Sequence, residues 1–274
     1  MASLSLLADP LWTSLDAPTA PLPDIPFVIF QIFAICFGAC FGSFANAAAM
    51  RLVRDESPHS PASRCRSCDK NLSWHQNIPI VSWLILRGKT ACCDTPLALR
   101  YIFVEVAFAG LALLYVSVMP LAVAAYFLLL CIIMMIALLT DLEAMVLHPP
   151  SLLLGIIAGL IAPFLIPAWP VPAFHAVIGA VTGSGILLLF NGAYRFMRGH
   201  NGFGAGDIWL MALIGAVLGW QAALFSFFAA SLLGAIAGIG LILVQKAGAM
   251  TKLPFGLFLS FVFLLYPALN MLLF

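Results

Sequence analysis

Two aspartates carry the chemistry that this sequence could perform. Gly204 and Gly206 alternate with other residues directly before Asp207, which opens an apolar run. Glycine allows close backbone approach and unusual dihedral angles, so these two residues could deliver the carboxylate into a crowded site. Asp141 directly follows the apolar run 121–140. Because an ionised group at a membrane boundary is costly and usually functional, we interpret Asp141 and Asp207 as the two halves of an aspartyl protease site within a membrane.

A pair of carboxylates can hydrolyse a peptide bond. Two carboxyl groups that share one proton supply a base for the water and an acid for the carbonyl oxygen. Asp207 could instead only cap the N-terminus of the following helix. That alternative does not explain Asp141. The pattern places Asp141 at a C-terminal helix end, where negative charge is disfavoured. A transporter that uses the same two acids for ion coupling is the alternative from another class.

The composition requires an apolar solvent for this chain. It has 274 residues, of which 64% are hydrophobic and 8% are charged, whereas soluble domains carry roughly 25% charged residues. The net charge of +1 gives no sign of a nucleic-acid partner. We therefore expect the lipid bilayer itself to be the main partner of the surface.

Eight apolar windows divide the sequence, and they predict an all-α integral membrane protein with about eight transmembrane helices. A span needs about 20 residues, and helices satisfy their backbone groups without water. The windows 151–166 and 208–220 are short, and we expect a turn near Gly219 to separate the sixth window from the seventh. The windows are 26–50, 98–119, 121–140, 151–166, 173–196, 208–220, 221–245 and 253–274.

The basic residues predict the orientation. If the loop 51–97 is cytoplasmic and there are eight spans, all twelve Lys and Arg residues fall on the cytoplasmic side, as the positive-inside rule favours. Both termini are then outside, and residues 1–25 form an external tail that lacks the basic start of a signal peptide. Asp141 and Asp207 both come to the cytoplasmic face.

The cytoplasmic loop contains four cysteines. Cys65 and Cys68 form a Cys-x2-Cys knuckle, and Cys92 and Cys93 follow as an adjacent pair. Four thiolates from two turns can hold a structural zinc ion and organise a loop that is too small for its own core. Adjacent cysteines suit one metal poorly, so free reduced thiols or a loop packed without metal are the alternatives.

A few residues inside the apolar windows also stand out. Glu105 is an acid within a predicted span, and it needs a partner or a path to water, so we treat it as a candidate functional residue. Glycines in the first and fifth windows suit close helix packing rather than chemistry. They are Gly38, Gly42, Gly179, Gly183 and Gly185.

Several motifs occur in one order along the chain. They are Gly42-Ser43-Phe44-Ala45-Asn46, the cysteine loop with Asn77-Ile78-Pro79-Ile80-Val81-Ser82-Trp83, Thr140-Asp141-Leu142-Glu143, Gly204-Ala205-Gly206-Asp207 and Leu253-Pro254-Phe255-Gly256. From about Phe37 onward, the chain thereby resembles the bacterial type IV prepilin peptidases, which are prepilin leader peptidases and N-methyltransferases of the GxGD aspartyl protease class.

The resemblance implies a function for each region. The enzyme would cleave type IV prepilins or pseudopilins on the cytoplasmic side of the inner membrane, with Asp141 and Asp207 as the catalytic pair. It would then methylate the new N-terminus with S-adenosyl-L-methionine. Residues 26–118 would hold the methyltransferase region, and residues 119–274 would form the six-span peptidase region.

The sequence departs from the family pattern in four respects. One is that Leu147-His148-Pro149-Pro150 stands where Leu-Pro-Asp is usual after the first aspartate, so an acidic residue is missing there. Thr90 stands where the third loop cysteine is usual, and Cys92 is an addition beside the matching Cys93. Trp209 replaces a usual lysine, and Leu257 replaces a usual proline. The cysteine change and Trp209 leave zinc binding, methyl transfer and substrate choice open, so a peptidase without methyltransferase activity is the alternative within the family. None of the four departures touches the two aspartates.

Overall fold

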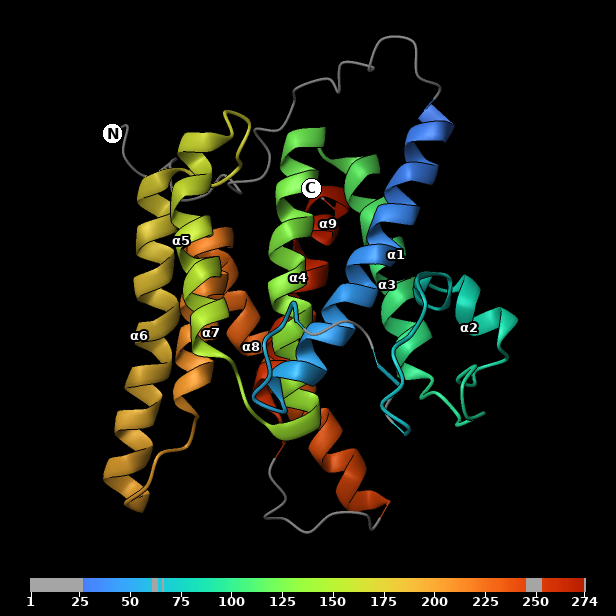
Figure 1. Cartoon of the computed structure of the whole chain (residues 1–274). Helices are drawn as coiled ribbons and strands as arrows, with labels where there is room; N and C mark the ends of the chain where they lie inside the picture. The colour runs from blue at the N-terminus through green and yellow to red at the C-terminus, as the bar shows by residue number, and fades with distance from the viewer. Residues whose placement is uncertain (1–26, 61–63, 66, 245–252, 274) are drawn as a thin grey trace. The chain divides into compact units, whose positions relative to one another are not determined.

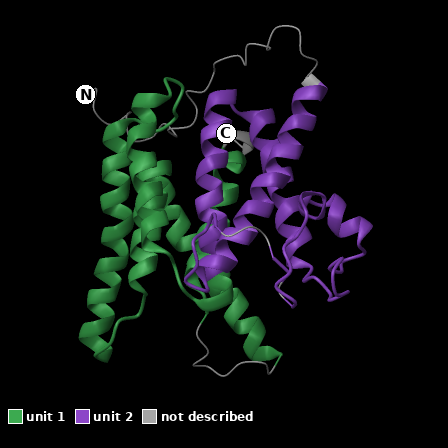
Figure 2. Ribbon diagram, viewed as in Figure 1, with its two compact units in different colours: residues 1–18, 141–274 green, residues 19–140 purple. Residues whose placement is uncertain are grey.

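The computed structural model describes residues 27–60, 64–65, 67–244 and 253–273 (Figure 1). The predicted tail 1–25 lies outside them. Within these ranges the regular secondary structure is helical, with two isolated β-bridges and no strand, which confirms the all-α prediction. The chain divides into two compact units at the boundary between Thr140 and Asp141 (Figure 2).

The unit that ends at Thr140 contains the first helices and the cysteine loop. Its elements are α1 (Phe27–Leu52), the 3-10 helix η2 (Trp74–Asn77), α2 (Val81–Ile85), α3 (Arg100–Val118) and most of α4 (Leu121–Ala144). Helices α1 and α3 pack closely. A Cβ atom on Gly38 would lie only 2.6 Å from the Cβ of Ala112, so the contact requires glycine. Buried Tyr115 joins α3 to α4, where its hydroxyl oxygen accepts a hydrogen bond from the Cys131 thiol at 3.7 Å.

The unit that begins at Asp141 is built around one central helix. Its helices are α5 (Pro149–Leu165), α6 (Ala173–Arg198), α7 (Ala205–Leu218), α8 (Trp220–Leu243) and α9 (Phe255–Leu273). Helix α7 packs against each of the other four. Gly179 on α6 lies against Gly215 on α7, and Gly183 lies against the backbone of Met211. Glycine is required there because the two backbones leave no room for a side chain.

Each of the eight apolar windows contains a helix, although its bounds shift by a few residues. Five of the described helices are long and apolar enough to cross a membrane, whereas α5, α7 and the segment 255–270 of α9 are shorter. The count of eight spans therefore stays a prediction. The turn at Gly219 is confirmed, with φ 86° between α7 and α8.

Two predictions about these windows need correction. Helix α7 begins at Ala205 rather than at residue 208, because Gly204 adopts the extended conformation that starts the helix. Gly185 was predicted to serve helix packing, but a Cβ atom there would meet nothing within 4 Å. The other four predicted packing glycines do lie against a neighbouring helix.

Candidate active site and cysteine cluster

Asp207 lies in the first turn of α7. Gly204 is the N-cap residue, with φ −71° and ψ 154°. The Oδ2 atom of Asp207 accepts a hydrogen bond from the backbone N–H of Gly204 at 3.1 Å. A negative charge is favourable at this end of a helix, where N–H groups lack intrahelical partners. Asp207 thus supports the helix start from its third position and is not itself the N-cap.

Asp141 lies in the last turn of α4, as predicted, and is only 5% exposed. This end of a helix disfavours a negative charge. The structure supplies a compensating partner, because Oδ2 of Asp141 accepts a hydrogen bond from the backbone N–H of Leu257 at 2.8 Å. Leu257 belongs to the first turn of α9, so Asp141 interacts with the N-terminal end of a second helix.

Two glycines and one leucine connect the segments that carry the acids. A Cβ atom on Gly256 would lie 2.9 Å from Oδ2 of Asp141 and 3.1 Å from Cδ1 of Leu147. A Cβ atom on Gly206 would lie 2.7 Å from the Cβ of the same leucine. Leu147 therefore lies against the segments of both acids. The unit therefore brings the two predicted acids together, and their catalytic role stays a prediction.

Asn191 holds the loop that precedes Asp207, and the sequence analysis missed it. This residue of α6 is 9% exposed. Its Oδ1 accepts hydrogen bonds from the N–H groups of Gly202 at 2.8 Å and Phe203 at 2.9 Å. Its Nδ2 donates to the carbonyl of Phe203 at 3.1 Å. The available signal was a carboxamide inside an apolar window, where a polar side chain needs partners.

The cysteine loop contains two hairpins of the same design. The first is closed by the bridge between Arg64 and Asn71, and the second by the bridge between Lys89 and Pro96. In the first, the N–H of Asp69 donates to the carbonyl of Cys65; in the second, the N–H of Asp94 donates to that of Thr90. Both aspartates adopt positive φ. Thr90 therefore occupies the place that Cys65 has in the first hairpin.

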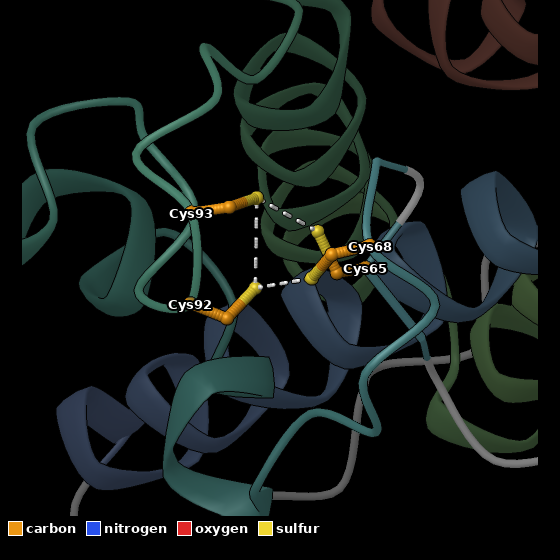
Figure 3. A group of neighbouring side chains, drawn as sticks. All are labelled: Cys65, Cys68, Cys92 and Cys93. Atoms are coloured by element: carbon orange, nitrogen blue, oxygen red, sulfur yellow. Dashed lines mark hydrogen bonds between the residues drawn. The ribbon is translucent and has the colours of Figure 1, made fainter.

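The four thiols nevertheless converge (Figure 3). The Sγ atoms of Cys65 and Cys93 are 3.5 Å apart, those of Cys68 and Cys92 are 3.3 Å apart, and those of Cys92 and Cys93 are 3.8 Å apart. All four lie within 4.8 Å of one another. Zinc–sulfur bonds of about 2.3 Å in a tetrahedron place the sulfurs about 3.8 Å apart. The geometry fits this metal, with Cys92 in place of the missing cysteine.

The surroundings of the thiols favour metal binding at two of the four positions. Hydrogen bonds with the hydroxyl groups of Thr90 and Thr95 lower the pKa of the Cys93 thiol to about 6. Backbone N–H groups of Ser67 and Cys68 lower the pKa of the Cys65 thiol. Hydrogen bonds with Cys65 and Cys68 raise the pKa of the Cys92 thiol to about 12. Thiolate is the ligand form, so metal binding would release the proton of Cys92.

Glu105 has the partner that a buried acid needs. It is 7% exposed, and its Oε2 accepts a hydrogen bond from the backbone N–H of Ile80 at 2.7 Å. Nearby Asn46, which is 1% exposed, donates from Nδ2 to the carbonyl of Tyr101 at 3.4 Å. The first of these contacts joins α3 to the cysteine loop.

Together, these features define a multi-pass membrane protein that holds two acids close together in one unit and has a tetracysteine loop in the other. Residues 36–119 match the family model described as the bacterial peptidase A24 N-terminal domain, and residues 128–239 match the type IV leader peptidase family. The chain belongs to the type IV leader peptidase family. The resemblance inferred from the sequence motifs is thereby confirmed.

Curated relatives cover most of the chain. A prepilin leader peptidase/N-methyltransferase of Aeromonas hydrophila is 35% identical over 261 residues, which cover 86% of this chain and 89% of the relative. Proteins with the same name from Myxococcus xanthus (strain DK1622) and Klebsiella pneumoniae are 33% and 34% identical, and the matches cover 69% and 88% of those relatives. A search of solved structures found no significant match.

Proposed function

We propose that this protein is a membrane-embedded aspartyl endopeptidase that removes the leader of type IV prepilins or pseudopilins. The substrate class comes from the relatives' name and from the family. The observation that carries the assignment of the site is that Leu147 lies against both Gly206, next to Asp207, and Gly256, which lies against Asp141. Each acid is also anchored by a backbone N–H at the start of a helix.

The two carboxylates divide the hydrolysis between them. One carboxylate removes a proton from the attacking water, and the protonated partner donates a proton to the carbonyl oxygen of the scissile peptide. The hydrogen bonds from Gly204 and Leu257 restrict the rotation of the two side chains. Restricted carboxylates hold the water and the peptide in a reactive geometry, which lowers the entropic part of the barrier.

The second proposed activity is methylation of the new N-terminus with S-adenosyl-L-methionine as methyl donor. It is supported by the name of the relatives and by the match of residues 36–119 to the N-terminal family domain. A structural zinc ion held by Cys65, Cys68, Cys92 and Cys93 would keep the two hairpins of this region together, and the sulfur spacing supports it.

The proposed location is the bacterial inner membrane, with both aspartates on the cytoplasmic side. The distribution of basic residues supports this orientation, because eight spans place all twelve of them on one face. In this orientation both termini lie outside, and the cysteine loop lies on the same side as the site.

Co-expression of a prepilin with variants of the enzyme tests the proposal. We expect Asp141→Ala and Asp207→Ala each to abolish leader removal, because neither carboxylate can act as acid and base alone. Glu143→Gln, which changes an exposed acid two residues from Asp141, should keep normal processing. Processing by either aspartate variant would refute the assignment. Mass measurement of the mature N-terminus distinguishes a methylating enzyme from a peptidase without this activity.

A further inference from the structure

The loop segment between the two cysteine hairpins exposes large apolar side chains. In the segment 74–85, Trp74 is 80% exposed, Leu84 is 58% exposed and Ile85 is 74% exposed. Val81, Leu84 and Ile85 have the spacing of residues on one face of α2. A run of exposed apolar residues outside a long helix indicates a surface that meets lipid or protein.

The other face of the segment packs on the loop itself. The ring of Trp83 is half-buried and lies against Gly88, where a Cβ atom would be only 2.8 Å away. The Ser82 hydroxyl donates to the carbonyl of Ile78 at 2.7 Å, which satisfies its polar group locally. The segment therefore has an inner face turned to the loop and an outer apolar face.

Glu105 joins this segment to α3; Figure 1 shows α2 beside the lower part of α3. Its carboxylate binds the N–H of Ile80, a β-branched residue at the unfavourable φ of 62°. Glu105 lies five residues after Arg100, the first residue of α3. Because helical residues rise about 1.5 Å each, Glu105 lies about 7.5 Å from that end, measured along the axis of α3. Amphipathic interfacial helices lie about 5–10 Å into the headgroup and acyl boundary.

The neighbouring side chains identify lipid as the occupant. Phe103 and Val106, on either side of Glu105 in sequence, are 67% and 50% exposed on a helix that is apolar enough to span a membrane. Arg87 and Lys89 directly follow the segment and are exposed. Basic side chains at this position suit anionic lipid headgroups.

We propose that residues 74–85 form an interfacial membrane anchor whose apolar face enters the lipid and whose position is fixed by Glu105. Because the anchor lies between the two cysteine hairpins, it holds the tetracysteine loop against the membrane surface. Glu105 acts as a positioning residue through the backbone N–H of Ile80.

Depth-dependent fluorescence quenching tests the anchor in the otherwise unchanged protein. An environment-sensitive fluorescent amino acid replaces Ile85, and it replaces Phe103 and His59 in two control proteins. Each protein is placed in vesicles of phosphatidylcholine and phosphatidylglycerol. We expect lipids brominated on their acyl chains to quench the probe at Ile85 as they quench the probe at Phe103, and aqueous iodide to quench only His59. The proposal would be overturned if iodide quenched the probe at Ile85 as it quenches the probe at His59. It would also be overturned if neither brominated lipid nor iodide quenched the probe at Ile85.

The positioning role of Glu105 is tested in the protein labelled at Ile85. Glu105→Ala should reduce quenching by brominated lipid toward the level at His59, while quenching at Phe103 stays unchanged and shows that α3 remains in the membrane. Glu105→Gln keeps an acceptor oxygen and should retain the quenching. Unchanged quenching in Glu105→Ala, or a loss in Glu105→Gln as large as in Glu105→Ala, would refute the role of the hydrogen bond.

Discussion

The two aspartates each lie where the start of a helix presents backbone N–H groups. For Asp207 that helix is its own, so the glycines before it allowed its position to be predicted from the sequence. For Asp141 the helix is α9, whose Leu257 lies 116 positions further along the chain. Sequence reasoning could identify Asp141 as an acid in an unfavourable place, but it could not identify a donor that only the tertiary fold brings near.

Leu257 provides a prediction specific to this chain, because proline at its position would have no N–H. Leu257→Pro should remove the hydrogen bond to Asp141 and leave α9 folded, since proline is tolerated in the first turn of a helix. Hydrogen bonds to charged groups contribute about 1.5–3 kcal/mol, so we expect prepilin cleavage to fall by about tenfold to a hundredfold. Leu257→Ala keeps the N–H and should cleave at nearly the normal rate. Equal rates for the two variants would contradict the role of this donor.

The loop between α6 and α7 depends on one side chain of the preceding helix. The apolar windows predicted both helices, but the hydrogen bonds of Asn191 to Gly202 and Phe203 depend on how the chain reverses after α6. The cysteine loop also depends on tertiary structure that the sequence pattern does not reveal. The adjacent Cys92 and Cys93 looked unsuitable for one metal, whereas the second hairpin turns both sulfurs toward Cys65 and Cys68.

Loss of the Asn191 clamp should impair the site without removing a catalytic group. Asn191→Ala deletes three hydrogen bonds, each worth about 1 kcal/mol. We expect a lower melting temperature and cleavage slower by about tenfold or more, because small displacements of catalytic groups are costly. Ser184→Ala is the control, since its hydroxyl bonds only to its own helix. Cleavage at the control's rate would show that the loop holds Asp207 without Asn191.

The equivalence of the two hairpins predicts that a cysteine can be moved between positions. Cys92→Ser should lose most of the bound zinc, because only three thiols remain. The double variant Thr90→Cys with Cys92→Ser should recover it, since Thr90 has the place that Cys65 has in the first hairpin. Metal analysis of the purified proteins measures both outcomes. Full zinc in the single variant, or none in the wild type, would be inconsistent with the proposed site.

At the scale of the molecule, composition and hydrophobic windows predicted the all-helical fold and the membrane setting. They could not determine how many helices cross the bilayer, because α5 and α7 are apolar but shorter than a normal span. Helix α7 explains part of this ambiguity. It packs against α5, α6, α8 and α9, so from Leu210 onward most of its apolar side chains are buried against protein rather than selected to meet lipid.

The most direct test of the central claim is the cleavage rate of purified enzyme carrying Asp141→Asn, Asp207→Asn or both. If the carboxylates work as one unit, each single variant should lose about 10⁴-fold or more in rate, and the double variant should be no slower than either single one. A single variant whose rate falls by much less than this, or losses that multiply in the double variant, would contradict the shared role of Asp141 and Asp207.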